Sequence, residues 1–259
     1  MATPPGFFAR RYTSPMTVLL ALDSSTETMA LALVTPSETT VMESAGGAQA
    51  SARMVPEARG LLARAGLALA DVDAIGFGRG PGAFTGLRTA CAVVQGLAFG
   101  AGKPVLSLDS LMLVAEDARR QAQSEGLVLE GTIWVAMDAR MSEIYAAAYR
   151  VDVNGRWTTE AHPALYRPAA LVEQWGEPAA VAGSALIAFE GQLGLAGRAV
   201  RCWPQTVSRA RALAALAEQA WAAGETLDAA EAMPVYVRDK VAQTTQERAQ
   251  ARAAAVLPT

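Results

Sequence analysis

Histidine and cysteine, which often bind metals or act as nucleophiles, are nearly absent from this sequence. Among 259 residues there is one histidine, His162, and there are two cysteines, Cys91 and Cys202. A zinc site built on a pair of histidines is excluded, and a serine–histidine–aspartate triad would need His162 itself. Because His162 precedes Pro163 in a polar stretch, we expect it on a surface loop. Two isolated cysteines indicate a reducing compartment, and we predict no metal site and no catalytic residue.

Lysine, net charge and long apolar runs are also low. Lys103 and Lys240 are the only lysines, the net charge is −3 and the pI is near 5.4. A broad basic face for nucleic acid is therefore not expected, so any contact with RNA would be local or indirect. No run reaches the roughly 18 apolar residues of a membrane span, and residues 1–15 lack the apolar segment of a secretory signal.

The most distinctive stretch is the glycine-rich run over residues 75–88, which reads IGFGRGPGAFTGLR. An apolar lead-in and the helical spacing over 85–101 predict a strand, a glycine turn and a helix with Thr85 as N-cap, because glycine weakens a strand interior. Such a turn could hold a phosphate on the N–H groups around Gly80 and Gly82. The glycines could equally let the loop pass tightly beneath a neighbouring backbone.

Two segments share a pattern of an apolar strand, an aspartate and a return strand. The first strand, 18–22, ends at Asp23 and is followed by hydroxyl side chains; the second, 132–137, ends at Asp138. The repetition indicates an internal duplication. A carboxylate beside hydroxyls can hold a magnesium-bound phosphate, although hydrogen-bonded turn chemistry explains the same residues. The candidate nucleotide- or phosphate-binding remnant comprises Asp23, Ser24, Ser25, Gly80, Gly82, Thr85 and Asp138.

Periodicity predicts the remaining elements and a mixed α/β layer pattern. Further strands are expected over 29–34, 39–44, 72–77, 104–108 and 143–150 and near 157, 179 and 198, and helices over 49–65, 111–121, 169–175 and 208–223, with Asp109 or Ser110 as the cap of the second. We expect a disordered leader over 1–15 with Met16 as the true start, an N-terminal lobe over 16–115 on which 206–240 packs back, a smaller lobe over 116–205, and a mobile tail over 244–259.

Four segments together closely resemble the TsaB (YeaZ) family, a branch of the actin, Hsp70 and sugar-kinase superfamily. They are residues 20–26, 78–88, 136–145 and 234–238, and the match extends in order from Thr17 to Lys240. The resemblance implies an α/β fold of two ribonuclease H-like lobes, the second of them reduced. In the superfamily, nucleotide binds in the cleft between the lobes.

The resemblance also implies a function. It is that of a bacterial, cytoplasmic subunit required to make threonylcarbamoyladenosine next to the anticodon of tRNA, without an active site of its own. In that family the TsaD paralogue is the enzyme and the heterodimer partner, TsaE is the ATPase, and TsaB alone forms a homodimer; tRNA is contacted only indirectly. No cofactor is implied beyond weak binding of ATP or ADP. The implied partner surface lies on the helices 49–65 and 85–101, with contacts from Arg53, Met54, Glu57, Leu61, Arg88, Cys91 and Gln95.

Two other functions stay open. A free-standing ATPase or phosphotransferase would use Asp23 and Asp138 across a cleft, with Gly183 and Ser184 as a faint candidate for adenosine contact. A protease would require His162, and the sequence offers it neither a metal cage nor a nucleophile–base pair.

Overall fold

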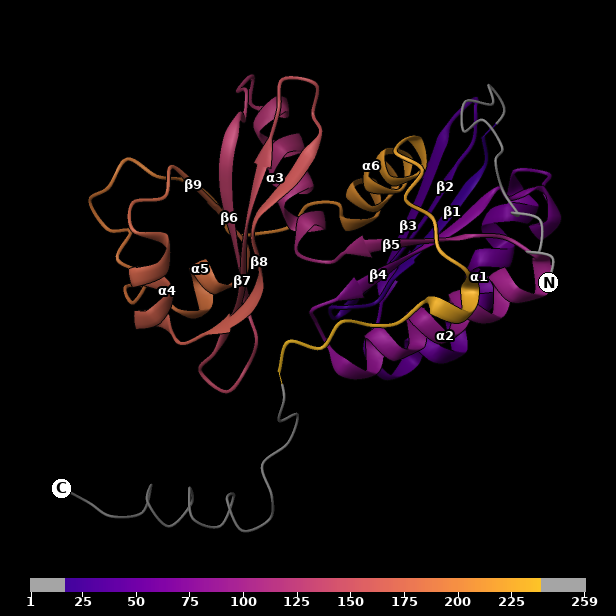
Figure 1. The fold of residues 1–259 in the computed structure, drawn as a ribbon, viewed down its shortest axis with the longest axis horizontal. Helices are drawn as coiled ribbons and strands as arrows, with labels where there is room; N and C mark the ends of the chain where they lie inside the picture. The colour runs from indigo at the N-terminus through magenta and orange to yellow at the C-terminus, as the bar shows by residue number, and fades with distance from the viewer. Residues whose placement is uncertain (1–16, 239–259) are drawn as a thin grey trace, which may run out of the picture.

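The computed structural model describes residues 17–238 (Figure 1). The expected leader, Met16 as a start and the tail over 244–259 lie outside the described residues. Figure 1 shows two lobes, each built on one sheet, with helix α6 (Arg209–Ala222) between them. In the described part of the chain, no helix combines the length and the apolar content that crossing a membrane requires.

The first sheet has five strands in the order β3-β2-β1-β4-β5. An antiparallel meander of β1 (Leu19–Asp23), β2 (Thr28–Val34) and β3 (Thr39–Ala45) is extended in parallel by β4 (Ala74–Gly80) and β5 (Val105–Asp109). β1 is central and buried on both faces, as its continuous apolar run LLAL before Asp23 predicts. Asp23, at the end of β1, is therefore carried into the interior.

The second sheet repeats this topology. Its order β10-β9-β6-β7-β8 contains an antiparallel meander of β6 (Gly131–Asp138), β7 (Ile144–Val151) and β8 (Trp157–Tyr166), extended in parallel by β9 (Ala180–Ala182) and β10 (Arg201–Trp203). The predicted duplication is confirmed, and so is the fold of two ribonuclease H-like lobes. The second lobe is reduced, since β9 and β10 have three residues each.

Helices cover both faces of each sheet. α1 (Ala50–Arg64) and α2 (Phe84–Ala101) pack on one face of the first sheet and α6 on the other. α3 (Met112–Ser124) packs on the second sheet and against α6, while α4 (Pro168–Trp175) and α5 (Ala185–Ala188) cover the opposite face. Short 3₁₀ turns over 47–49, 69–71 and 229–231 complete the elements.

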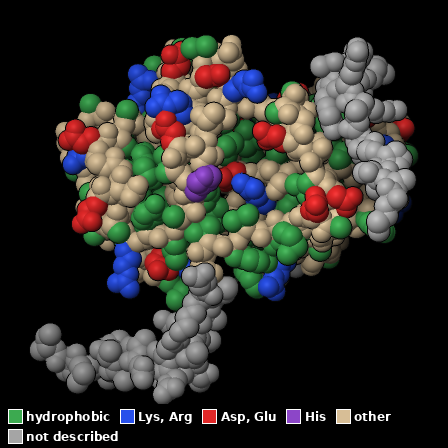
Figure 2. Space-filling view, in the orientation of Figure 1, with side chains coloured by type: hydrophobic (Ala, Val, Ile, Leu, Met, Phe, Trp, Pro, Cys, Tyr) green, Lys and Arg blue, Asp and Glu red, His purple; other side chains and the backbone are tan. Residues whose placement is uncertain are grey.

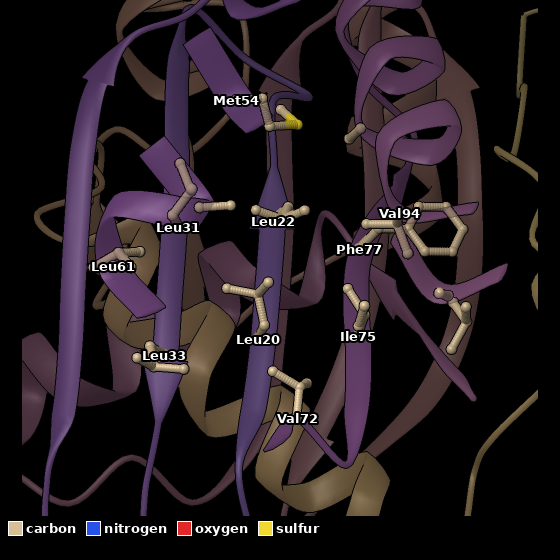
Figure 3. Close-up of a cluster of buried hydrophobic side chains, with 14 of the residues drawn as sticks. Leu20, Leu22, Leu31, Leu33, Met54, Leu61, Val72, Ile75, Phe77 and Val94 are labelled. Atoms are coloured by element: carbon tan, nitrogen blue, oxygen red, sulfur yellow. The ribbon is translucent and has the colours of Figure 1, made fainter. Parts of the chain in front are cut away.

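The core beneath α1 and α2 follows the alternation of the strands (Figure 3). Alternate residues of β1, β2 and β4 point to these helices, and Met54, Leu61 and Val94 meet them from the helical side. Fully burying one such side chain contributes roughly 1.5–3 kcal/mol. The strand residues that are labelled in Figure 3 are Leu20, Leu22, Leu31, Leu33, Ile75 and Phe77.

Several local predictions are wrong. β4 continues past the predicted strand end at 77, so Gly78 and Gly80 lie in a strand and not in a turn. Helix α2 begins at Phe84 after Ala83, and Thr85 lies inside its first turn instead of capping it. His162 lies in strand β8 and not in a loop, although its side chain is exposed as expected.

The glycine strand has a steric explanation. A Cβ atom on Gly78 would overlap the carboxylate of Asp23, which occupies the space beside β4. Glycine is needed there because another group comes close, and that requirement outweighs the weak strand preference of glycine. The N-cap of α3 is Leu111, and not Asp109 or Ser110 as predicted. Oδ1 of Asp109 still accepts from the N–H groups of Leu111 at 2.9 Å and Met112 at 3.3 Å at the start of the helix.

Candidate functional site

A cleft of about 630 Å³ lies between the two lobes. One wall comes from the turn after β1 and the start of α2, and the other from the turn after β6 and from residues 235–238. Of the seven residues in the candidate phosphate-binding remnant, Ser25, Gly82 and Asp138 line this cleft. The other four do not line it, so the structure brings only part of the predicted site together.

Asp23 is fully buried beneath the cleft and is paired with Arg209 of α6. Nε of Arg209 donates to Oδ2 of Asp23 at 2.5 Å, and Nη2 donates to Oγ of Ser25 at 2.6 Å and to the carbonyl oxygen of Ser110 at 3.0 Å. The Oδ2 atom also accepts from the hydroxyl of Ser25 at 3.0 Å. The carboxylate that could have held a magnesium-bound phosphate is therefore neutralised by an arginine of the same chain.

The glycine loop packs directly on the turn after β1. The N–H of Ala83 donates to the carbonyl oxygen of Ser25 at 2.7 Å, and the hydroxyl of Ser24 donates to the carbonyl oxygen of Gly86 at 2.8 Å. A Cβ atom on Gly82 or Gly86 would overlap the carbonyl oxygens of this turn. This geometry favours tight backbone packing over phosphate binding as the reason for the glycines, because the N–H of Ala83 is already used.

The turn after β6 forms the opposite rim of the cleft. Asp138 accepts from the N–H of Arg140 at 2.8 Å, and its own N–H donates to Oγ of Ser184 at 3.0 Å. Arg140, Met141 and Ser142 have φ angles of 63°, 55° and 57°. Left-handed backbone costs roughly 1–2 kcal/mol for a residue other than glycine, so this rim needs support from elsewhere in the fold.

Arg238 supplies that support. Its Nη2 donates to the carbonyl oxygen of Ala139 at 3.0 Å and to Oε2 of Glu143 at 2.8 Å, and its guanidinium lies 5.8 Å from the centre of the Tyr145 ring. Arg238 is the last residue of the segment 234–238, one of the four segments in which the sequence resembles the TsaB (YeaZ) family. It thus joins a segment attached to the first lobe to the turn after β6 in the second.

The predicted partner residues on α1 and α2 fall into two groups. Met54, Leu61 and Cys91 are buried in the core of the first lobe, so their assignment to a partner surface is wrong. Burial also raises the pKa of the Cys91 thiol, which keeps it protonated and a poor nucleophile. The apolar stripe of each helix meets its own sheet and leaves the opposite stripe for any partner.

The four polar members of that prediction are at least partly exposed. Arg53 pairs with Glu57 one helical turn away, and Glu57 also accepts from the hydroxyl of Ser44 at 3.2 Å. Nε2 of Gln95 donates to the carbonyl oxygen of Ala232 at 2.8 Å. Exposed Arg88 contacts the same C-terminal segment through Tyr236.

Sequence reasoning missed Phe99 and Gly100, which α2 presents outward. Phe99 is 81% exposed, although phenylalanine is usually buried. Gly96 and Gly100 have open space where a Cβ would stand, and Ala92 lies one turn before Gly96. The outer face of α2 is thus apolar, and most of its side chains are small. Its sequence signal is the position of Phe99, which falls outside the buried spacing of Cys91, Val94 and Ala98.

The charges around the cleft are mixed. On the face shown in Figure 2, acidic and basic side chains are interspersed over both lobes, without a large area of one sign. Within residues 17–238, no group of three or more histidine, cysteine, aspartate or glutamate side chains could hold a metal ion. His162 does not line the cleft.

Comparisons with known proteins give one consistent relationship. The family model described as TsaD, tRNA N6-adenosine threonylcarbamoyltransferase, matches residues 30–256. The chain is 32% identical over 228 residues to the Escherichia coli tRNA threonylcarbamoyladenosine biosynthesis protein TsaB, covering 86% of this chain and 96% of that protein.

Two solved structures from Pseudomonas aeruginosa are similar to most of this chain. One is an uncharacterized protein with similarity to peptidase YEAZ, with a TM-score of 0.75 and 35% identity over 86% of this chain and all of that one. The other is YeaZ, with a TM-score of 0.72 and 36% identity over 85% of this chain and all of that one.

Proposed function

This chain belongs to the TsaB (YeaZ) family, and on that premise we propose that it is a non-catalytic partner subunit of the TsaD enzyme in the biosynthesis of threonylcarbamoyladenosine in tRNA. The observation that carries the proposal is the buried pair of Asp23 and Arg209, because it occupies the carboxylate that a nucleotide-using relative of this fold would need. The chain has the two-lobed fold of such an enzyme, but the carboxylate of Asp23 is already paired with Arg209 of the same chain.

The outer face of α1 and α2 is the proposed surface for TsaD. Phe99 offers an aromatic contact, and Ala92, Gly96 and Gly100 allow a partner helix to approach closely. We propose that the same face forms a homodimer when TsaD is absent. TsaE joins the assembly as its ATPase, tRNA reaches this subunit only through the others, and the assembly works in the cytoplasm.

Phe99→Glu tests the surface. We expect this variant to bind TsaD at least about tenfold more weakly than the unchanged chain, since a charge replaces an apolar contact. Titration calorimetry with purified TsaD measures the affinity, and an assay of modified tRNA in the reconstituted system measures the outcome. Val128→Glu is the matched control, because Val128 is 70% exposed and lies in the second lobe. An equal loss of affinity for TsaD in both variants, or no loss in either variant, contradicts the proposed surface.

A free-standing ATPase or phosphotransferase is the alternative, and the cleft of about 630 Å³ with Asp138 on its rim favours it. On our proposal the chain alone shows neither micromolar binding of Mg-ATP in calorimetry nor turnover. If both are observed and Asp138→Asn abolishes them, the chain is an enzyme and the partner-subunit proposal is wrong. A protease, the third function, would have to lose its activity in Asp23→Ala and His162→Ala.

A further inference from the structure

Residues 232–238, here called the strap, run along α2 towards the second lobe without regular secondary structure (Figure 1). The carbonyl oxygen of Ala232 accepts from Gln95 at 2.8 Å and from the thiol of Cys91 at 3.2 Å. The N–H of Val235 donates to the carbonyl oxygen of Arg79 at 2.7 Å. With Arg238 held by the second lobe, the strap is fixed at its start, middle and end.

The strap clamps Arg88 at the start of α2. The guanidinium carbon of Arg88 lies 3.8 Å from the centre of the Phe84 ring, and Nε donates to the hydroxyl of Tyr236 at 2.9 Å. The two rings lie 5.2 Å apart, centre to centre, so they support one another. An exposed arginine normally samples many rotamers, whereas this one is held by two aromatic side chains.

The clamp leaves the outer end of Arg88 available. Nη1 and Nη2 make no hydrogen bond to any residue between 17 and 238, and the side chain is exposed. These two nitrogens are the donors that bind a carboxylate in a bidentate manner. Two strap side chains are also exposed, Met233 at 66% and Tyr236 at 44%.

We propose that the clamped Arg88 receives an acidic side chain of TsaD, with Met233 and Tyr236 as the apolar border of that contact. The inference rests on the proposed function and extends its surface from α2 onto the strap. A guanidinium that is already ordered loses little entropy on binding, and methionine, tyrosine and arginine are enriched at protein interfaces. The apolar border and the continuity with Phe99 on α2 favour a protein carboxylate over an RNA phosphate.

Four variants, each titrated with TsaD by calorimetry, test the contact. Arg88→Ala should weaken binding about thirtyfold and Arg88→Lys about tenfold, because lysine keeps the charge and loses the two-pronged geometry. Tyr236→Phe should weaken it about threefold, since it removes only the hydrogen bond that orients Arg88. Arg211→Ala, an exposed arginine on α6, is the control and should leave the affinity unchanged. Higher salt should weaken the unchanged chain more than Arg88→Ala.

These measurements distinguish failure of the proposed function from failure of the Arg88 contact. If the unchanged chain does not bind TsaD, the proposed function itself is wrong. If it binds and Arg88→Ala binds equally well, only the role of Arg88 is wrong. If Arg88→Ala keeps its affinity for TsaD but loses binding of tRNA in the absence of TsaD, the arginine serves an RNA phosphate and our assignment to a carboxylate is overturned.

Discussion

Arg209→Met is expected to lower the free energy of unfolding by about 3–5 kcal/mol, because it leaves the carboxylate of Asp23 buried without its cation. Asp23 has no exposed surface, and Arg209 also satisfies the hydroxyl of Ser25 and the carbonyl oxygen of Ser110. Urea unfolding followed by tryptophan fluorescence measures the loss. A decrease below about 1 kcal/mol, the size typical of an exposed ion pair, would contradict the structural role of the pair.

The double variant Asp23→Asn, Arg209→Met separates the structural role from a catalytic one. Removing both charges takes away the unpaired carboxylate, so most of the lost stability should return. Because the proposed function assigns no chemistry to the pair, the double variant should still bind TsaD and support tRNA modification. A folded double variant that binds TsaD but supports no modification would show that the pair has a chemical role.

Gly86→Ala is expected to lower the free energy of unfolding by about 3 kcal/mol or more. Its new Cβ would overlap the carbonyl oxygen of Ser24, which is backbone and cannot move without disturbing β1, and overpacking of this kind is strongly destabilising. Gly100→Ala is the matched control in the same helix, where the Cβ meets open space, and it should stabilise the chain by about 0.5–1 kcal/mol. Thermal and urea unfolding of both variants measure the difference. Similar stabilities for the two would mean that α2 can shift away from the turn after β1.

The local sequence pattern was enough to predict most of the fold. Apolar alternation and helical spacing located the strands and helices, and the repeated strand–aspartate pattern revealed the duplication that the two sheets confirm. The pattern failed where a close neighbour decided the structure, as at Gly78, where the carboxylate of Asp23 sets the residue type of β4. A propensity argument cannot include a group that lies far away in sequence.

The site was harder to predict for the same reason. Asp23 and Arg209 are separated by 186 positions, and the only local sign of their pairing is that Arg209 shares the helical face of Leu213 and Leu216. The assignment of Met54, Leu61 and Cys91 to a partner surface failed for a different reason. An apolar stripe on a helix predicts burial, but it does not say whether its own sheet or a partner provides the cover. Charge and exposed aromatic side chains mark the partner side better.

The position of α6 in the chain also matters for synthesis. A ribosome that has completed all five strands of the first sheet has still to make the second lobe before it reaches the helix that covers the sheet's remaining face. Until then Leu19, Leu106 and Leu108 stay open to water on the nascent chain. The first lobe is thus the earliest part to be translated and among the last to be finished.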